Sequence, residues 1–294
     1  MTNNNKFIFN NLEQILEGDL KYDTSTLLQY ATDASAYREV PLAVVLPKTK
    51  NDIITLINFA KDNNLSLIPR AAGTSLAGQV VGNGIVVDIS KHWGQILEIN
   101  AENHWVKVEP GVILDELNMA LKPYGLFFGP ETSTSNRCMM AGMVGNNSCG
   151  SHSLIYGSTR DHLLSLKMIL DDGVEYEFGD LTKAEFEAKC ELNSKEGDVY
   201  RFFKDILGNE NNRTVIIENS PNPSIKRRNT GYALDLLVTD SFFGSDNQTF
   251  NLSKLIAGSE GTLGIITEIT LNCVQLPPKE KAVVAVHLKE RNQA

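Results

Sequence analysis

Short apolar runs separated by turn-forming residues dominate the first third of the chain. Residues 42–46, 65–68 and 85–89 are runs of this kind, and their length and flanking residues predict buried strands. Between the first two, residues 49–60 carry apolar side chains at spacings of three and four behind a threonine N-cap. This spacing predicts an amphipathic helix. The pattern therefore predicts a β-α-β unit within a small, mostly parallel layer.

The hydrophobic pattern changes near residue 105. Residues 105–108 alternate in hydrophobicity and predict a strand, while residues 114–121 predict a helix. Residues 163–170 and 174–178 flank a glycine turn and predict a β-hairpin. The second region is therefore predicted to contain antiparallel strands as well as helices.

The later part of the chain carries a charged segment and two further strand-like runs. Residues 182–209 predict a helical insertion or covering layer, residues 264–275 a β-branched strand, and residues 282–288 another strand. The organisation that we expect has four parts. These are an irregular N-terminal lead-in (1–35), a first subdomain (36–104), a second subdomain (105–276) with the insertion near 182–209, and the start of a following domain (277–294).

Composition narrows the class of protein. The chain has 294 residues, of which 42% are hydrophobic and 21% charged, as in an ordinary globular protein. Its formal net charge of -9 argues against binding to a nucleic-acid backbone. No apolar run approaches the roughly 20 residues of a membrane span, and the first residues lack the layout of a secretory signal. We therefore expect a cytoplasmic α/β or α+β protein.

The cysteines do not indicate a metal centre. Cys138, Cys149, Cys190 and Cys273 match neither the spacings of zinc sites nor those of iron–sulfur clusters. We interpret them as structural thiols and assign no metal ligand.

The first of three glycine-rich segments is PRAAGTSLAG, residues 69–78, directly after a predicted strand. Its small residues let backbone N–H groups approach an anion closely. It is not a Walker A loop, because Gln79 and Val80 replace the lysine and the hydroxyl residue. It also lacks the G-x-G-x-x-G pattern of nicotinamide sites, and the surroundings of Ser75 lack the second glycine of a hydrolase nucleophile elbow. A tight turn without a ligand is the alternative interpretation.

The other two segments are residues 129–150, GPETSTSNRCMMAGMVGNNSCG, and residues 258–267, GSEGTLGIIT. The former has few large aliphatic side chains and predicts a long loop without a core element, and such loops are usually functional or disordered. Each segment by itself could be a loop that needs positive φ. Three of them on one acidic chain favour a large, flat, phosphorylated ligand.

The order of these segments resembles the FAD-binding (PCMH-type) domain of the vanillyl-alcohol oxidase / p-cresol methylhydroxylase superfamily. Residues 258–267 are similar to its GSEGTLGIIT signature almost letter for letter. Together with residues 129–150, YGSTRD at 156–161 and KRRNTGY at 226–232 resemble the N-terminal part of FAD-linked D-2-hydroxy-acid (D-lactate, glycolate or D-2-hydroxyglutarate) dehydrogenases fused to an iron–sulfur domain. The resemblance covers roughly residues 30–290.

This resemblance implies two α/β subdomains with FAD between them. It places the pyrophosphate against Pro69, Arg70, Ala71, Ala72, Gly73, Thr74, Ser75, Leu76 and Gly78. It places the ribityl chain and flavin beside Pro130, Glu131, Thr134, Ser135, Ala141, Gly142, Val144, Gly145, Asn146 and Ser148, with Glu260, Gly261, Gly264, Ile265 and Ile266 opposite. Many relatives tether FAD through a histidine in the first loop. That loop has no histidine here, so we expect noncovalent FAD.

The resemblance also implies the activity. In such enzymes a 2-hydroxy acid is oxidised to a 2-oxo acid, and the electrons leave through the iron–sulfur domain to an acceptor. The residues that grip the substrate lie in the following substrate domain, so we expect this chain to be inactive alone and assign it no catalytic residue. A position at the inner membrane through an electron-transfer partner is the alternative to a purely cytoplasmic one.

Several residues outside the glycine segments leave alternatives open. His152 and His162 are either hydrogen-bonded structural residues or a ligand or base. Lys226, Arg227 and Arg228 form either an exposed basic turn or an aid to an anionic ligand.

Three other functions remain open from the sequence. One is a noncatalytic FAD-binding subunit of a complex. Another is a cell-wall-type reductase of the same superfamily, for which we find no catalytic serine. The third is an α/β interaction protein without a ligand, which would show no flavin absorbance.

Overall fold

The computed structural model describes residues 9–225, 227–228, 231–280 and 282–290. Its N-terminal half is built on a sheet of four strands, whose order is β1-β2-β4-β3. The strands are β1 (Asp19–Lys21), β2 (Ala43–Leu46), β3 (Leu67–Arg70) and β4 (Ile85–Asp88). β2, β4 and β3 are parallel, and β1 adds to the edge in the antiparallel sense. The predicted small, mostly parallel layer is confirmed.

The helix α3 (Lys50–Asp62) covers this sheet, as the apolar spacing predicts. Thr49 and Asp52 form a capping box at its N-terminus. The Asp52 carboxylate also accepts the backbone N–H groups of Glu17, Gly18 and Lys48. One buried carboxylate therefore ties the N-terminal segment to the helix.

The lead-in, residues 1–35, is not irregular where the structure describes it. It contains β1 and the helix α2 (Thr24–Tyr30), which starts at the N-cap Asp23. The prediction failed because each element has a single buried apolar anchor, Leu20 and Leu27, and one anchor gives no periodicity.

The second half is built on an antiparallel sheet of five strands in the order β5-β6-β12-β8-β9. The strands are β5 (Ile96–Asn100), β6 (Trp105–Val108), β8 (Leu163–Ile169), β9 (Glu175–Phe178) and β12 (Ile265–Asn272). The predicted hairpin and the strands at 105–108 and 264–275 are confirmed. β5 was not predicted, and it extends this sheet to residues before 105. As an edge strand it is only half-buried, so it lacks a clear apolar alternation.

Short helices pack beneath this sheet. They are α4 (Leu114–Leu121), the single 3-10 turn η1 (Lys122–Tyr124), α5 (Met140–Asn146), α6 (Ser153–Tyr156) and α7 (Thr159–His162). Two short strands, β7 (Leu126–Phe127) and β13 (Val274–Gln275), pair beside them. The prediction that residues 129–150 hold no core element is wrong, because Met140, Met143 and Val144 of α5 are buried. Their i, i+3, i+4 spacing is the helical signal, which the surrounding Gly, Ser and Asn residues obscured.

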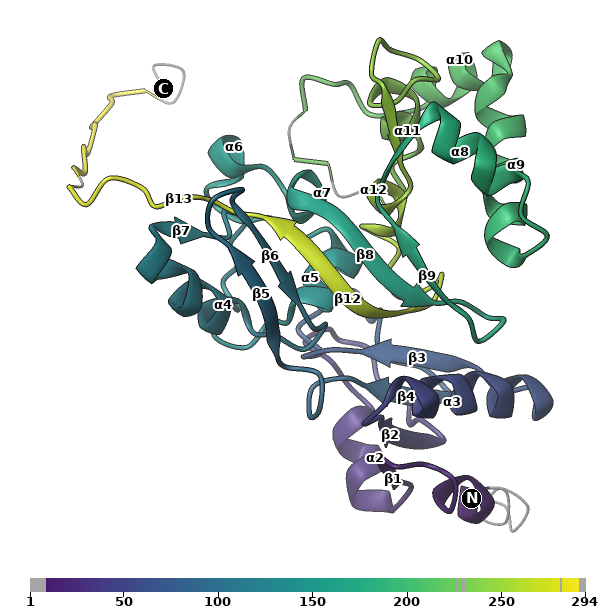
Figure 1. The fold of residues 1–294 in the computed structure, drawn as a ribbon. Helices are drawn as coiled ribbons and strands as arrows, with labels where there is room; N and C mark the ends of the chain where they lie inside the picture. The colour runs from purple at the N-terminus through teal and green to yellow at the C-terminus, as the bar shows by residue number, and fades with distance from the viewer. Residues whose placement is uncertain (1–8, 226, 229–230, 281, 291–294) are drawn as a thin grey trace.

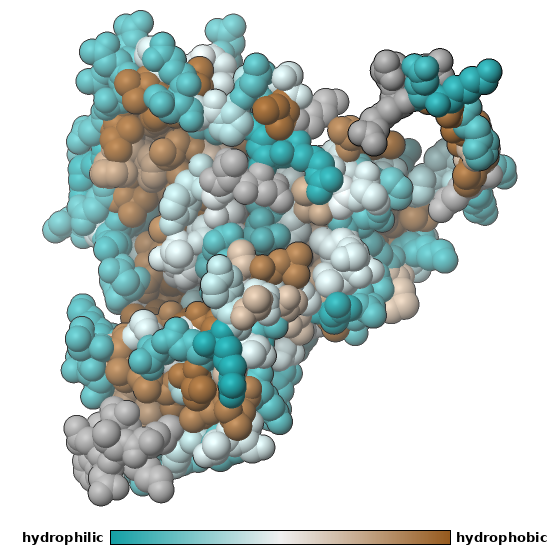
Figure 2. All heavy atoms as spheres, turned by 180° about the vertical axis from the view of Figure 1, so that it is seen from behind, coloured by the Kyte–Doolittle hydropathy of each residue, from teal (hydrophilic) through white to brown (hydrophobic). Residues whose placement is uncertain are grey.

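At the upper right of Figure 1, a lobe extends beyond the helical insertion that was predicted near residues 182–209. It comprises β10 (Asp180–Thr182), α8 (Lys183–Cys190), α9 (Lys195–Gly208), α10 (Glu210–Glu218), α11 (Leu234–Thr239), β11 (Thr249–Asn251) and α12 (Ser253–Ile256). An aromatic cluster around Phe186, Tyr200 and Phe250 fills its centre. On the opposite face, apolar side chains gather on this lobe and on the N-terminal half (Figure 2). Residues 282–288, predicted as a strand, are exposed and form no strand.

The two halves share part of one core. Ile169, at the end of β8, and Ile265, at the start of β12, belong to the cluster that packs on α3 and the first sheet. The end of β8 and the start of β12 therefore meet the first sheet. β3 lies directly beneath these strand ends in Figure 1. The fold is α+β, with a junction between the sheets where three loops meet.

Candidate cofactor site

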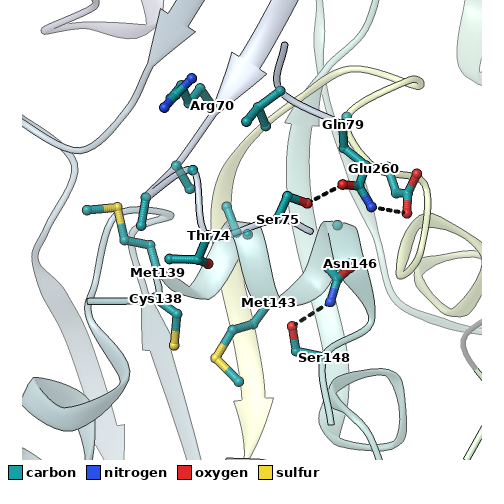
Figure 3. Close-up of a pocket in the computed structure, with 18 of the residues that line it drawn as sticks. Arg70, Thr74, Ser75, Gln79, Cys138, Met139, Met143, Asn146, Ser148 and Glu260 are labelled. Carbon is teal, nitrogen blue, oxygen red and sulfur yellow. Dashed lines mark hydrogen bonds between the residues drawn. The ribbon is translucent and has the colours of Figure 1, made fainter. Parts of the chain in front are cut away.

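A cavity of about 640 Å³ lies at this junction. Three walls surround it, and Figure 3 shows how their side chains lie. One wall is residues 69–77 after β3, the second is residues 137–149 in and around α5, and the third is residues 259–266 before and in β12. These are the three glycine-rich segments of the sequence, brought together as predicted.

The loop after β3 presents unused hydrogen-bond donors. The backbone N–H groups of residues 72–76 have no acceptor within the described part of the chain. Gly73 in their midst has a φ of +63°, and such a turn lets successive N–H groups converge on an anion. Residues 72–75 are half-buried and Leu76 is exposed, so these N–H groups are accessible to a ligand with anionic oxygens such as a diphosphate.

Arg70 supports this loop. Its guanidinium donates to the carbonyl oxygens of Tyr30 (3.3 Å) and Thr32 (2.9 Å) and lies over the Tyr30 ring at 5.0 Å. Burial lowers the pKa of Arg70, against the opposing effect of the nearby Asp88 carboxylate. The Arg70 side chain therefore joins residues 30–32, in the segment predicted as a lead-in, to the first wall of the cleft. It also adds positive charge to that wall.

The α5 wall is made of small residues so that the other walls can approach it. A Cβ placed on Gly142 would lie 3.3 Å from the Cβ of Ala71, and one on Gly145 would lie 3.8 Å from the Cα of Glu260. The methyl group of Ala71 thus packs where Gly142 has no side chain. This contact shows how the alanine at position 71 is accommodated between the two walls.

The third wall is a rigid turn. The backbone N–H groups of Gly258 and Glu260 donate to the carbonyl oxygens of Val144 and Gly145, each at 2.9 Å. The hydroxyls of Tyr232 and Thr262 lie 2.5 Å apart. Glu260 has a φ of +54°, which is uncommon for a residue other than glycine. The end of α5 and the Tyr232 hydroxyl therefore hold this turn in a strained backbone conformation. Such conformations are typical of functional sites.

A chain of side chains links the first and third walls, at the right of Figure 3. The Ser75 hydroxyl donates to the side-chain oxygen of Gln79, and the Gln79 amide nitrogen donates to the Glu260 carboxylate. This bridge connects the two halves of the molecule beside the cleft.

Most residues that the resemblance assigns to FAD line the cavity. They are Pro69, Arg70, Ala71, Ala72, Gly73, Thr74, Ser75, Leu76, Thr134, Ala141, Gly142, Gly145, Asn146, Ser148, Glu260, Gly261, Gly264, Ile265 and Ile266. Five others, Gly78, Pro130, Glu131, Ser135 and Val144, lie outside its lining. Gly78 lies under the Tyr37 ring, and Pro130 and Val144 are buried behind the walls. The Ser135 carbonyl accepts the Asp115 N–H of α4, and the Glu131 carboxylate meets His152 at 2.8 Å.

The cavity also has lining residues that the sequence did not indicate. Gln79, Cys138, Met143 and Met168 are among them. Gln79 is adjacent to the first loop, which is the signal that could have found it. Met168 comes from a segment without a glycine pattern, so no local signal marks it. Arg227, which the sequence left open as an aid to an anionic ligand, also lines the cavity.

The basic cluster divides between two roles. Arg228 pairs with Asp235, whereas Arg227 is exposed and lines the cavity. Lys226 lies outside the described residues, as do Asn229 and Thr230 of the KRRNTGY motif.

Neither candidate histidine lines the cavity. The ring nitrogens of His162 lie 2.6 Å from the carbonyl oxygen of Tyr156 and 3.2 Å from that of Asn272, and the residue is buried. His152 is 60% exposed and pairs with Glu131. His162 therefore has a structural role, and His152 lies outside the cleft lining.

The described residues contain no group of three or more His, Cys, Asp or Glu side chains that could hold a metal ion. Cys138, Cys190 and Cys273 are buried, and burial raises the pKa of each thiol, to about 12 for Cys273. Cys149 is half-buried and lines the cavity together with Cys138. None of the described helices is long and apolar enough to cross a membrane.

The donor set fits FAD. One wall offers unpaired N–H groups to phosphate oxygens, and Met139, Met143, Met168 and Ile265 offer apolar surface to a flat ring. Glycine or alanine occupies the points where the walls approach most closely. The cavity is therefore suited to an elongated ligand with an anionic part and a flat part.

Comparisons with known proteins agree with this geometry. Residues 41–179 match the family model described as "FAD binding domain". The D-2-hydroxyglutarate dehydrogenase of Pseudomonas putida is 38% identical over 88% of this chain and 25% of its own length. The glycolate oxidase subunit GlcD of Bacillus subtilis is 27% identical over 94% of this chain and 47% of its own length. This chain thus spans about a quarter of the dehydrogenase it matches.

Solved structures with the same fold include an alkyldihydroxyacetonephosphate synthase. It superposes with a TM-score of 0.61 at 17% identity, over 92% of this chain and 41% of that one. At this identity the likeness shows the fold.

Proposed function

We propose that this chain is the FAD-binding module of a flavin-dependent D-2-hydroxy-acid dehydrogenase, because residues 41–179 match the family model of an FAD binding domain. The observation that carries the proposal is the cleft with unpaired N–H groups at residues 72–76 on one wall and glycine-lined walls around it. The substrate class is supported by the dehydrogenase and oxidase relatives, whose names specify D-2-hydroxyglutarate and glycolate. The higher identity of the dehydrogenases favours a D-2-hydroxyglutarate type over a D-lactate type.

When bound, FAD accepts the two electrons that the hydroxy acid loses as it becomes a 2-oxo acid. The residues of this chain bind and orient the cofactor. The N–H groups after β3 hold the diphosphate, Arg70 adds positive charge behind it, and the small residues of α5 allow the flat ring to lie close. The Gln79–Glu260 bridge keeps the two halves together beside the cofactor.

The base that accepts the hydroxyl proton comes, in this proposal, from outside the described cleft. Among the described residues that line the cavity, Glu260 has the only carboxylate, and this carboxylate already accepts a hydrogen bond from the Gln79 amide. No histidine lines it in the described part of the chain. A general base must lie within hydrogen-bonding reach of the proton that it removes. We therefore place the substrate grip and the base in a following substrate domain, beginning near residues 277–294.

An alternative is a noncatalytic FAD-binding subunit of a complex. The same absence of a base among the lining residues favours it, and the match to a glycolate oxidase subunit supports it. The two proposals share the cofactor and differ in where the substrate domain is encoded. An iron–sulfur electron partner, noncovalent attachment of FAD and a cytoplasmic position belong to the proposal as well.

Flavin titration of the purified chain tests the proposal. FAD, FMN and riboflavin are added separately, and binding is followed by flavin fluorescence and absorbance. We expect FAD to bind one to one and riboflavin, which has no phosphate, to bind at least about ten-fold more weakly. A folded sample that binds no FAD, or that binds riboflavin as tightly as FAD, would refute the proposal.

A further inference from the structure

Arg160 is a buried cation whose guanidinium meets main-chain carbonyl groups instead of a carboxylate. Only 4% of the residue is exposed. Its Nε donates to the carbonyl oxygen of Ala257 at 3.1 Å, one Nη donates to that of Gly231 at 2.7 Å, and the same Nη also reaches Ala257. Within the described residues, all of its side-chain hydrogen bonds have carbonyl acceptors.

The backbone of Arg160 is fixed from several sides. Its N–H donates to the Asn147 side-chain oxygen at 2.9 Å, and its carbonyl accepts Lys254 Nζ at 2.9 Å. The neighbouring Thr159 donates its N–H and its hydroxyl to the Ser148 carbonyl, at 2.9 and 2.8 Å. The backbone of Arg160 is therefore attached to the residues that follow α5. Of these residues, Ser148 and Cys149 line the cleft.

Both acceptors of the guanidinium lead directly into the cleft. Ala257 precedes the turn whose Ser259, Glu260 and Gly261 line the cavity. Gly231 follows the lining residue Arg227 in the sequence. One side chain thus connects the end of α5, the residue before the third wall and Gly231, which are far apart in sequence.

Among the residues that the structure describes, no ion pair neutralises the charge of Arg160. The two carboxylates that act on it electrostatically are Asp161 and Asp235. Asp161 accepts the N–H and hydroxyl of Ser158, and Asp235 pairs with Arg228. Burial lowers the pKa of Arg160 to about 10, so the side chain remains a cation near neutral pH. Burying a charge is costly, and an apolar residue of similar size often serves stability better, so stability alone does not explain an arginine here.

Gly258 is complementary to this guanidinium. A Cβ at Gly258 would lie 2.6 Å from an Arg160 Nη and 2.6 Å from the Gly231 carbonyl oxygen. Gly258 also has a φ of +96°, which other residues rarely adopt. The absent side chain leaves the space through which Arg160 reaches Gly231.

We propose that Arg160 is a positioning residue for the cofactor, which sets the separation between the glycine turn at 258–264, Gly231 and the end of α5. The inference rests on the proposed FAD-binding function. Arg160 acts through the carbonyl groups of Ala257 and Gly231, and its cationic charge makes this side of the cleft favourable for an anionic ligand. Loss of the guanidinium is therefore expected to change the fit of FAD more than the stability of the fold.

The experiment compares Arg160→Met, which removes all donors at similar length, with Arg160→Lys, which keeps the charge but not the planar fork. The matched control is Arg201→Met, because Arg201 also donates to two main-chain carbonyls, those of Cys190 and Leu192, in the insertion lobe away from the cleft. For each protein the FAD dissociation constant, the visible spectrum of the bound flavin and the urea midpoint of the apo-protein are measured.

We expect Arg160→Met to weaken FAD binding at least about ten-fold and Arg160→Lys by a smaller factor, both with a changed flavin spectrum. Arg201→Met should lower the urea midpoint and leave FAD affinity within about two-fold of the parent. If Arg160→Met fails to fold, Arg160→Lys decides the question. Arg160 variants that are destabilised but bind FAD as the parent does, with its spectrum, would overturn the inference. A parent protein that binds no FAD would instead refute the proposed function.

Discussion

The side-chain amide of Gln79 donates to the carboxylate of Glu260 at 3.0 Å, across a separation of 181 residues in the sequence. Gln79 belongs to the half built on the parallel sheet, and Glu260 to the half built on the antiparallel one. The Gln79 oxygen accepts the Ser75 hydroxyl and the Ala77 N–H, so the orientation of the amide is fixed. Both halves are therefore connected beside the cleft by one side chain whose oxygen and nitrogen are both hydrogen-bonded.

Replacing Gln79 with glutamate should loosen this connection. Gln79→Glu sets two carboxylates against each other, and exposed charge pairs are worth about 1 kcal/mol or less. We expect FAD to dissociate up to about five-fold faster, measured by dilution or displacement. Adding Glu260→Gln in the same protein removes the repulsion and should restore the parent rate. An unchanged rate in Gln79→Glu would show that the bridge does not retain the cofactor.

Gly73 should tolerate no side chain. A Cβ there would lie 2.6 Å from an Arg70 Nη, and a φ of +63° penalises a branched residue. We expect Gly73→Val to weaken FAD binding at least about ten-fold and to lower the free energy of unfolding by about 1–2 kcal/mol. Gly94→Val is the control, because nothing lies within 4 Å of a Cβ at that exposed position. If Gly73→Val binds FAD as tightly as the parent does, the assignment of the diphosphate to this loop is wrong.

Acid precipitation should release all of the flavin. No histidine lies among residues 69–78, and none lines the described cleft, so the usual tethering side chain is missing. The absorbance of the supernatant is compared with the total flavin, and the pellet should be colourless. A yellow pellet would contradict noncovalent binding, and Cys138→Ser and Cys149→Ser would then identify which of the two lining thiols is attached.

The FAD-loaded chain should not oxidise a D-2-hydroxy acid by itself. His162 has both ring nitrogens beside carbonyl oxygens, and His152 pairs with Glu131 outside the cavity lining. Hydride transfer needs a base and a firmly held substrate. We expect D-2-hydroxyglutarate to leave the flavin absorbance unchanged without oxygen, whereas dithionite bleaches it in the same cuvette. If the hydroxy acid bleaches the flavin in the parent but not in His152→Ala, the base lies on this chain.

Acid should weaken the contact between the halves at Glu175. Partial burial raises the pKa of this carboxylate, but hydrogen bonds from Lys50 of α3 and Thr267 of β12 outweigh burial and hold it below 4.5. A group whose pKa is depressed in the folded state contributes stability above its unfolded pKa and loses it as the pH falls through the folded value. The urea midpoint should therefore fall less steeply below pH 4.5 in Glu175→Gln than in the parent. An equal fall of the urea midpoint with pH in Glu175→Gln and in the parent would contradict this prediction.

The sequence predicts the parts of the site that are encoded locally. Gly73 and Gly261 mark turns that need positive φ, so the loops that contain them stand out in the sequence. Met168 reaches the site through strand pairings made far away in the chain, so nothing near it in sequence marks it. Arg160 lies in the YGSTRD motif, but nothing near it in sequence indicates the carbonyl groups that it meets. β5 was missed because an edge strand buries little, and α5 because its apolar spacing is short. What the sequence lacks is the information about which segments become neighbours.

The strand order of the second sheet has a consequence for how the protein is made. β12 lies between β6 and β8, yet it is the last of these strands to leave the ribosome. The first sheet, complete by residue 88, can form while synthesis continues, because domains fold as units during translation. The second sheet lacks its centre until residue 272 has emerged, and the turn at 258–264 has no strand to anchor it before then. A nascent chain therefore carries an exposed, half-built second sheet until residue 272 has emerged, and its cleft can be completed only after that point.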